Sequence, residues 1–289
     1  MRPVREAKDG LAHGFRTRFK GVDGLDPVAP RNPAEELMQR SSGLPKSVLT
    51  LSSFALLGAL VFGASVASSN APCPDGMAFV PGSGFCVDRY EASLMEIRPD
   101  GREVPHSPYM NPGRADVRAV TRRGVVPQGY ISQVQAARAC ARSGKRLCSE
   151  REWFRSCRGP NGRTHGYSNQ RQDGRCNENH RWHPVVRLFR STTPYLWGMA
   201  LMNDPQINQL PGTVSLTGAH AGCSNEHGVF DMVGNLHEWT ADSEGTFRGG
   251  YYMDTTINGE GCWYRTPGHN TAYHDYSIGF RCCATAGEE

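Results

Sequence analysis

The sequence predicts a loop-rich α+β domain held together by disulfides, and three features support this fold class. Glycine (33 residues) and proline (19 residues) are abundant, while 38% of the chain is hydrophobic, which is typical of a globular protein with many turns. Ten cysteines without a Cys-x-x-Cys pair indicate disulfides formed in an oxidising compartment. Two helix signals lie among short strand signals, and 289 residues suit one domain with a tail.

The first part of the chain lies outside this domain, which we expect at residues 72–286. Residues 1–46 are polar and lack apolar periodicity, so we expect a disordered leader or a segment absent from the mature protein. Residues 47–71 form a hydrophobic segment. Within it, positions 48–67 carry no charge and number about the ~20 residues that span a bilayer.

Two interpretations of residues 47–71 stay open. The basic residues Arg40 and Lys46 favour a single membrane anchor whose N-terminal side lies in the cytoplasm. If translation starts at Met38, the same segment is a cleaved signal peptide. The candidate cleavage sites are then Ser65-Val-Ala67 and Ser69-Asn-Ala71. Both interpretations place the domain outside, as a periplasmic, extracellular or membrane-anchored protein on the outer side of the cytoplasmic membrane.

The charge distribution excludes one class of partner. The net charge of +4 is mild, and the basic residues are scattered along the chain rather than gathered on one aromatic-laced element. We therefore expect no nucleic-acid binding. Contact with a membrane is expected only through the N-terminal hydrophobic segment.

The first elements of the domain are short strands. Residues 73–92 predict two strands joined by a Pro-Gly-Ser-Gly turn at 81–84. Cys73 and Cys86 would then lie opposite each other and could pair. The span 98–123 is rich in turns, because proline and glycine interrupt every apolar run, and it leads to the first helix.

The first helix is predicted over residues 132–142. Val134, Ala137 and Cys140 fall on one face of it. Gly144 follows directly, so we expect the helix to end with this glycine in the left-handed conformation.

The second helix begins at Ser149, which has the spacing of a capping box with Glu152. Cys148 and Trp153 occupy the positions of a hydrophobic staple around the same cap. The helix ends near Cys157, before an Arg-Gly-Pro sequence. We expect both helices to pack on a sheet.

The most distinctive stretch is 225–239, Asn-Glu-His-Gly-Val-Phe-Asp-Met-Val-Gly-Asn-Leu-His-Glu-Trp. It lies after a polar, irregular region at 158–210, within a part where short strands and turns are expected from Thr213 onward. Its glycines suit turns with positive φ, and its Asn, Asp and Glu oxygens suit a hard cation. The alternative is a polar turn bordering a core. That core would contain Phe230, Val233, Leu236 and Trp239.

Several motifs occur in order along the domain. They are Gly144-Lys-Arg-Leu147, Ser149-Glu-Arg-Glu-Trp153, Asp231-Met-Val-Gly-Asn-Leu-His-Glu-Trp239, Arg248-Gly-Gly250 and Gly279-Phe-Arg-Cys282. Together they resemble the sulfatase-modifying-factor family, to which the formylglycine-generating enzyme belongs. The resemblance covers most of the chain and implies a single domain with a C-type-lectin-like fold. It does not specify the activity, because one fold hosts many functions.

The resemblance also implies a disulfide framework. In the family, a cysteine of the first helix pairs with that of the Gly-Phe-Arg-Cys motif, and one after the second helix pairs with one shortly before that motif. Cys148 stands where the family usually has proline, and Cys283 is an extra cysteine, so we pair these two. The remaining two cysteines then pair with each other. The expected disulfides are Cys73–Cys86, Cys140–Cys282, Cys148–Cys283, Cys157–Cys262 and Cys176–Cys223.

The chemistry that the resemblance implies needs residues that this chain lacks. The formylglycine-generating enzyme oxidises a cysteine of a client sulfatase with two reactive cysteines that bind copper, and thiolates are soft ligands that suit monovalent copper. The corresponding positions here are Tyr252 and Ile257, and no cysteine lies between Gly250 and Cys262. We therefore expect no copper.

Histidines offer an alternative redox site, because five of them fall in the last third of the chain. His237, His274 and Asp275 have the composition of a non-haem iron site with two histidines and a carboxylate. The other interpretation is that they are surface or hydrogen-bonded core residues. The absence of His-x-Glu and His-x-x-x-His spacings favours it.

The resemblance further implies a calcium site with a structural role. Asp231 and Glu238 would supply side-chain oxygens, and Gly234 and Leu236 backbone carbonyls, an all-oxygen shell that suits Ca²⁺. The ion would hold the loop in place. A second site near Asn177 is a weaker expectation.

Two classes of function stay open. The first is an exported binding module whose loops 251–260 and 267–276 present aromatic and polar side chains to a small ligand or an exported protein. The second is a sulfatase-modifying-type or non-haem-iron oxidoreductase that acts on an exported protein. The missing cysteine pair favours the first class, and a stoichiometric redox metal would favour the second.

Overall fold

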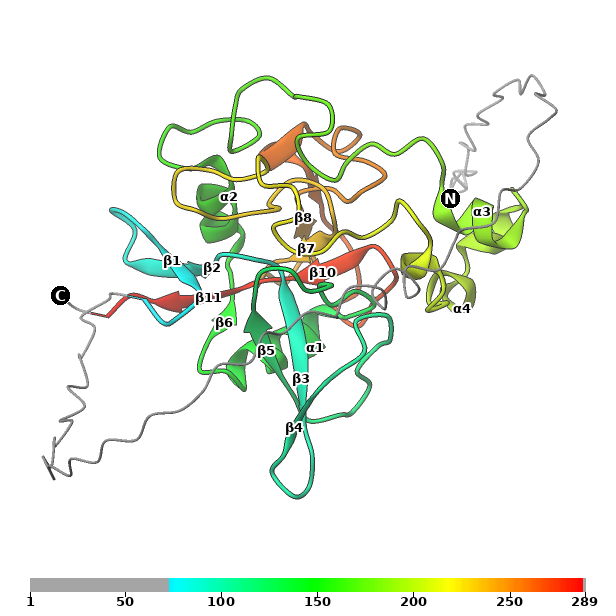
Figure 1. Cartoon of the computed structure of the whole chain (residues 1–289), viewed down its shortest axis with the longest axis horizontal. Helices are drawn as coiled ribbons and strands as arrows, with labels where there is room; N and C mark the ends of the chain where they lie inside the picture. The colour runs from blue at the N-terminus through cyan, green and yellow to red at the C-terminus, as the bar shows by residue number, and fades with distance from the viewer. Residues whose placement is uncertain (1–72, 288–289) are drawn as a thin grey trace, which may run out of the picture. The chain divides into compact units, whose positions relative to one another are not determined.

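A computed structural model of the chain describes residues 73–287. Within them the chain forms short strands connected by long turns, with few helices (Figure 1). The strands are β1 (Met77–Val80), β2 (Phe85–Asp88), β3 (Ala92–Ile97), β4 (Glu103–Pro105), β5 (Val117–Thr121), β6 (Arg146–Leu147), β7 (His237–Trp239), β8 (Phe247–Arg248), β9 (Arg265–Thr266), β10 (Ile278–Phe280) and β11 (Cys282–Thr285). The helices are α1 (Gln133–Ala141), α2 (Glu150–Arg158), α3 (Pro184–Phe189) and α4 (Met199–Met202), with 3₁₀ turns η2 (Pro194–Trp197), η3 (Ile207–Gln209) and η4 (Gly261–Trp263). The predicted α+β class is confirmed.

Three small sheets organise the domain. The first has the order β1-β2-β11-β6 and is antiparallel throughout, so the last strand of the chain lies between two early ones. The second has the order β10-β7-β8-β9, with β10 parallel to β7. The third, β4-β3-β5, is antiparallel. Residues 98–123, expected as turns, therefore contribute two strands to a sheet.

The predicted first hairpin is present as β1 and β2, joined by the turn at 81–84. Cys86 lies opposite Phe79 in this pair, so Cys73 reaches it from before the first strand rather than from a facing strand position. The disulfide between them ties the residues that precede β1 in the sequence to β2.

Both helices begin with the local signals that the sequence contains. Ser149 accepts a hydrogen bond from the N–H of Glu152, whose carboxylate accepts one in return from the N–H of Ser149, so the capping box is complete. Ser132 and Gln135 form the same arrangement at α1. Gly144 lies just beyond α1 with φ of 68°, as predicted.

The expected buried face of α1 is wrong in part. Val134 is 48% exposed and Ala137 is exposed as well, so only Cys140 of the predicted face is buried, together with Gln133, Ala136 and Ala139. The reason is that Gln133 is held inside by donating hydrogen bonds to the carbonyls of Thr240 and Asp242. The hydrogen-bonded side chain of Gln133 is thus buried in place of Val134, which was expected to be buried because it is apolar.

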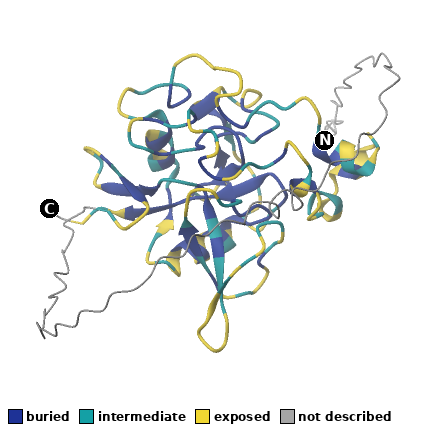
Figure 2. Ribbon diagram, in the orientation of Figure 1, coloured by how far each residue is buried: buried dark blue, intermediate teal, exposed yellow. Residues whose placement is uncertain are grey.

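The buried residues form separate groups, and residues of the first sheet contribute to more than one of them. Figure 2 shows how the buried segments run through the strands and the turns between them. One group of buried side chains surrounds Trp153 of α2 and includes Cys148 and Cys283. Another surrounds Trp239 and includes Cys140 of α1 and Cys282. Adjacent residues of a strand point to opposite faces, and accordingly the two neighbouring cysteines of β11 belong to different groups.

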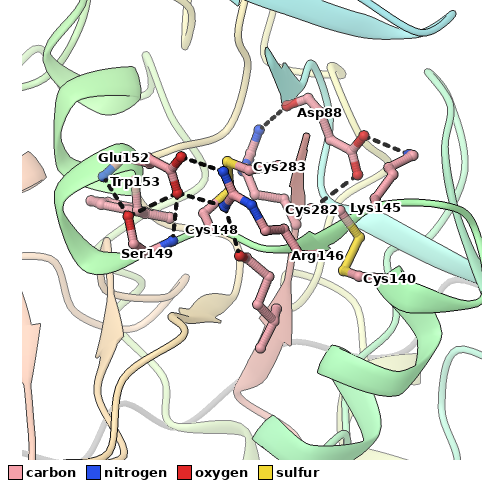
Figure 3. Close-up of a disulfide and its surroundings, with 12 residues drawn as sticks. Asp88, Cys140, Lys145, Arg146, Cys148, Ser149, Glu152, Trp153, Cys282 and Cys283 are labelled. Atoms are coloured by element: carbon pink, nitrogen blue, oxygen red, sulfur yellow. Dashed lines mark hydrogen bonds and ion pairs between the residues drawn. A yellow bond between two sulfur atoms is a disulfide. The ribbon is translucent and has the colours of Figure 1, made fainter. Parts of the chain in front are cut away.

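The disulfides join the pairs that the sequence analysis expects, Cys73–Cys86, Cys140–Cys282, Cys148–Cys283, Cys157–Cys262 and Cys176–Cys223. Figure 3 shows how Cys282 and Cys283 reach in different directions, one to α1 and the other to the residue before the cap of α2. Beside them, Arg146 of β6 forms an ion pair with Glu152. The last strand is thus covalently attached to the start of one helix and to the body of the other.

The segment 47–71 and the leader before it fall outside the described residues. Among residues 73–287, no helix has the length and apolar character needed to cross a bilayer.

Candidate functional site

The loop that would carry reactive cysteines in the resembled family holds different side chains here. Tyr252 is fully buried, and its hydroxyl donates to Oδ1 of Asn208 at 2.9 Å. Ile257 points outward and is 81% exposed. The two positions therefore face the core and the solvent respectively, and they do not converge on a common reacting atom.

Hydrogen bonds hold this loop in one shape despite its lack of regular structure. Oδ1 of Asp254 accepts from the N–H groups of Thr256 and Ile257 at 2.9 and 3.1 Å, and Oδ2 accepts from the hydroxyl of Tyr264 at 2.8 Å. The carbonyl of Asn258 accepts from the N–H of Arg265. The loop is a preorganised support for the side chains at its tip.

The tip of the loop exposes a mixed apolar and polar surface, which we call the tip surface. Its residues are Ile257, Asn258, Glu260 and Trp263. Trp263 is 52% exposed, and its ring packs edge-on against Phe154 at 4.7 Å, with the guanidinium of Arg158 5.0 Å from the ring centre. A large aromatic ring held by α2 and left half open to solvent is typical of an anchor for a ligand or partner.

Beneath the loop, His237 is buried in a cluster of aromatic rings. Its ring centre lies 4.6 Å from that of Phe247, 4.7 Å from Tyr251 and 5.4 Å from Tyr264. Burial lowers the pKa of His237 to about 3, so the imidazole is neutral. This arrangement is that of a core histidine rather than of a general acid.

The other two residues of the iron hypothesis have their own partners. Asp275 accepts from the N–H and hydroxyl of Ser277 and from the hydroxyl of Tyr273 at 2.6 Å, and burial raises the pKa of its carboxyl. Nδ1 of His274 lies 2.7 Å from Oδ1 of Asn203. Within residues 73–287, no three side chains of His, Cys, Asp and Glu are grouped so as to hold a metal ion.

The stretch 231–238 folds around a group of buried carboxylates. Asp231 and Asn235 both have φ of 55°, and Gly234 has φ of 78°, so the backbone coils tightly there. Oδ2 of Asp231 accepts from the N–H of Gly218 at 2.6 Å. Burial raises the pKa of Asp231 to about 6.

Arg281 of the Gly-Phe-Arg-Cys motif neutralises Glu238. Its guanidinium donates to both carboxylate oxygens at 2.6 and 2.7 Å, and to the carbonyls of Asp88 and Phe230. The indole N–H of Trp153 donates to the same carboxylate at 2.7 Å. Arg281 is fully buried and Glu238 nearly so, so the pair links the second sheet, the first sheet and α2.

Glu91 is the member of this group that the sequence analysis missed. Its carboxylate accepts from the N–H of Leu236 and from the side-chain amide of Asn235. Burial, together with nearby Asp231 and Glu238, raises its pKa well above the usual value. The only local signal was an acidic residue next to a strand, and its partners lie some 145 positions away.

The predicted calcium ligands Asp231, Gly234, Leu236 and Glu238 lie in this coiled, carboxylate-rich stretch. Glu91, Asp231 and Glu238 lie near one guanidinium, but both oxygens of Glu238 already accept from Arg281, and burial raises the pKa of Glu91 well above its usual value, so a calcium site here stays a prediction. Within the described residues, Oδ1 of Asp231 accepts no hydrogen bond. Near the same loop, Asn177 donates to Oδ1 of Asn235 and accepts at its carbonyl from that residue's N–H, so its side chain already has a structural role.

Comparisons with known proteins find one matching family model and several similar solved structures. The model of the sulfatase-modifying factor enzyme 1-like domain matches residues 87–286. A comparison with curated proteins finds no match. Similar solved structures include the Major Tropism Determinant I1 variant, with a TM-score of 0.43 and 13% identity over 75% of this chain and 54% of that one. CarF has a TM-score of 0.39 and 16% identity over 70% of this chain and 86% of that one. The chain thus spans about half the length of the tropism determinant.

Proposed function

The chain belongs to the sulfatase-modifying factor enzyme 1-like domain family, and on that premise we propose that it acts as an exported ligand- or protein-binding module rather than as a copper oxidase. Its α+β, C-type-lectin-like architecture supplies the support. The tip surface supplies the contact with a small ligand or an exported protein.

The state of the cysteines carries this proposal. All ten cysteines of the sequence lie in the described part, and all of them form disulfides. Copper oxidation of a client cysteine requires thiolates that bind the metal. The donor set present at the corresponding loop, a buried tyrosine and an exposed isoleucine, does not fit copper.

The five disulfides also support export, because disulfides persist in oxidising compartments outside the cytoplasm. Calcium, if bound, would be held by Asp231 and Glu238 with the carbonyls of Gly234 and Leu236. Its role would be to neutralise buried charge and hold the stretch beneath the loop, not to carry out chemistry.

The enzymatic alternative is tested directly. The purified chain is loaded with copper or iron, dialysed, and mixed with a peptide that carries a sulfatase-type cysteine. We expect no stoichiometric redox metal by elemental analysis and no aldehyde by mass spectrometry. Conversion of the peptide, or one equivalent of either metal per chain, would overturn the proposal in favour of an oxidoreductase.

The binding role is tested with a photoreactive amino acid at Ile257, on the tip surface. The matched control places it at Leu216, an exposed apolar residue outside the loop. In the exported compartment we expect a discrete crosslinked product from position 257 that is missing from position 216. Equal labelling from both positions would show that the tip surface has no special role in binding.

A further inference from the structure

A second surface lies in residues 180–203, which form α3, η2 and α4 and stand at one side of the domain (Figure 1). We call it the 180–203 surface. Large apolar side chains are exposed throughout this segment. They are Trp182 (69%), Tyr195 (78%), Trp197 (48%) and Met199 (43%). A concentration of exposed aromatic residues in one short segment marks an interaction site, because isolated exposed hydrophobics are ordinary but grouped ones are not.

The charge of the same segment has one sign. Arg181, Arg187 and Arg190 are exposed, and the segment contains no aspartate or glutamate, although the chain has 28 of them. Within the described residues, none of these three arginines forms an ion pair. Their charges are therefore free to meet an anionic partner.

A small pocket opens on this surface between the arginines. It has a volume of 90 Å³ and is lined by Arg181, Trp182, Pro184 and Arg187 from α3 and the residues before it, facing Pro211. The guanidinium of Arg187 donates to the carbonyl of Pro211 at 3.2 Å, which fixes its position at the rim. The pocket combines two cations with an aromatic wall, which suits a phosphate group at an apolar boundary.

We propose that the 180–203 surface docks on an anionic membrane, with its arginines at the lipid phosphates and its tryptophans and tyrosine at the interface. Tryptophan and tyrosine prefer the headgroup level of a bilayer, and basic residues are attracted by anionic lipids. The uncharged run at 48–67 in the same sequence independently favours a chain that works near a membrane. This contact is additional to the N-terminal one that the sequence analysis expects.

The position of the surface dictates how the domain meets the bilayer. α3 lies at the opposite side of the domain from β1, which follows the start of the described residues (Figure 1). A domain docked through the 180–203 surface therefore carries the side that contains β1 away from that contact.

Tryptophan fluorescence of the full chain tests the docking, because residues 48–67 contain no tryptophan and do not contribute to the signal. The chain is reconstituted into vesicles of phosphatidylcholine brominated on its acyl chains, with or without phosphatidylglycerol. We expect stronger quenching in the anionic vesicles. The variant W182F/W197F loses that quenching, whereas W263F, which removes an exposed tryptophan elsewhere, keeps it.

A charge variant tests the recognition. R181Q/R187Q/R190Q is expected to reduce the docking equilibrium roughly 100-fold on anionic vesicles, since each arginine near such a surface contributes about fivefold. The control R114Q/R138Q/R151Q changes three other exposed arginines and leaves docking unchanged. Equal quenching in neutral and anionic vesicles would overturn the proposal. Shielding of Trp182 and Trp197 from solvent that increases with protein concentration in the absence of lipid would also overturn it. That result would indicate that the surface binds a second copy of the chain.

Discussion

Removing the disulfide Cys148–Cys283 tests how the covalent framework stabilises the fold. Taken alone, this bond closes a loop of 135 positions, and Cys140–Cys282 closes one of 142. The chain-entropy model assigns about 5 kcal/mol to each loop of that length. Because Cys282 and Cys283 are neighbours, however, either bond in the presence of the other closes a ring of only about ten residues, which the same model values at about 3 kcal/mol.

The expected result follows from these rings. C148A/C283A and C140A/C282A should each lower the free energy of unfolding by about 3 kcal/mol. Removing both bonds should cost roughly 6 to 7 kcal/mol. When both are absent, the first one to re-form closes a ring of between thirty and forty residues, because this ring passes through the remaining disulfide Cys157–Cys262. The combined loss therefore exceeds the sum of the separate losses by about 1 kcal/mol.

Urea unfolding under non-reducing conditions measures all four proteins, in an osmolyte that keeps the weakest variant folded. The alanine substitutions leave small cavities, but these contribute equally to the separate and combined variants and cancel in the comparison. Losses of 5 kcal/mol for each bond, or a combined loss equal to the sum within a few tenths of a kcal/mol, would refute the reasoning from shared rings.

The other predictions concern the buried charges and the coiled stretch around them. Arg281→Met leaves Glu238 buried without its cation and should cost roughly 3 to 5 kcal/mol in urea unfolding; a loss below about 1 kcal/mol would contradict the pairing. Because the pKa of Asp231 is raised to about 6, its protonated form contributes stability that is present below about pH 4 and lost as the pH rises to 6. Asp231→Asn should therefore gain about 2 kcal/mol at pH 7 relative to pH 4 against the native chain, and the same pH dependence of the melting temperature in both proteins would exclude this assignment. Calcium should raise the melting temperature of the native chain at pH 7 but not that of Asp231→Asn, and equal shifts in both would locate the ion elsewhere. Gly234→Ala should cost more than about 2 kcal/mol, because the new Cβ would lie 2.3 Å from the carbonyl oxygen of Asn177 at φ of 78°, whereas Gly144→Ala, with φ of 68° and open space, should cost about 1 kcal/mol.

The elements that the sequence predicts correctly depend on neighbours in the chain. The capping boxes at Ser132 and Ser149 and the glycine after α1 are specified within a few residues, so reading the local pattern suffices. The disulfide pairs follow from the family pattern instead, since ten cysteines can be paired in many ways.

The features that the sequence does not reveal depend on distant partners. β4 and β5 exist because they pair with β3, although proline and glycine interrupt the segment that contains them. The buried Gln133 depends on carbonyls more than a hundred positions away. Glu91 joins Asp231 and Glu238 only in the folded chain, so the charge balance of the candidate calcium site could not be derived from spacing.

The position of β11 has a consequence for how the protein is made. This strand is the last of the described chain, yet it lies between β2 and β6 and carries Arg281's neighbours Cys282 and Cys283. An incomplete chain lacks the middle of its first sheet and the partners of two earlier cysteines. Cys140 and Cys148 therefore reach these partners only once the last strand is available, so this part of the covalent framework closes on a nearly complete chain.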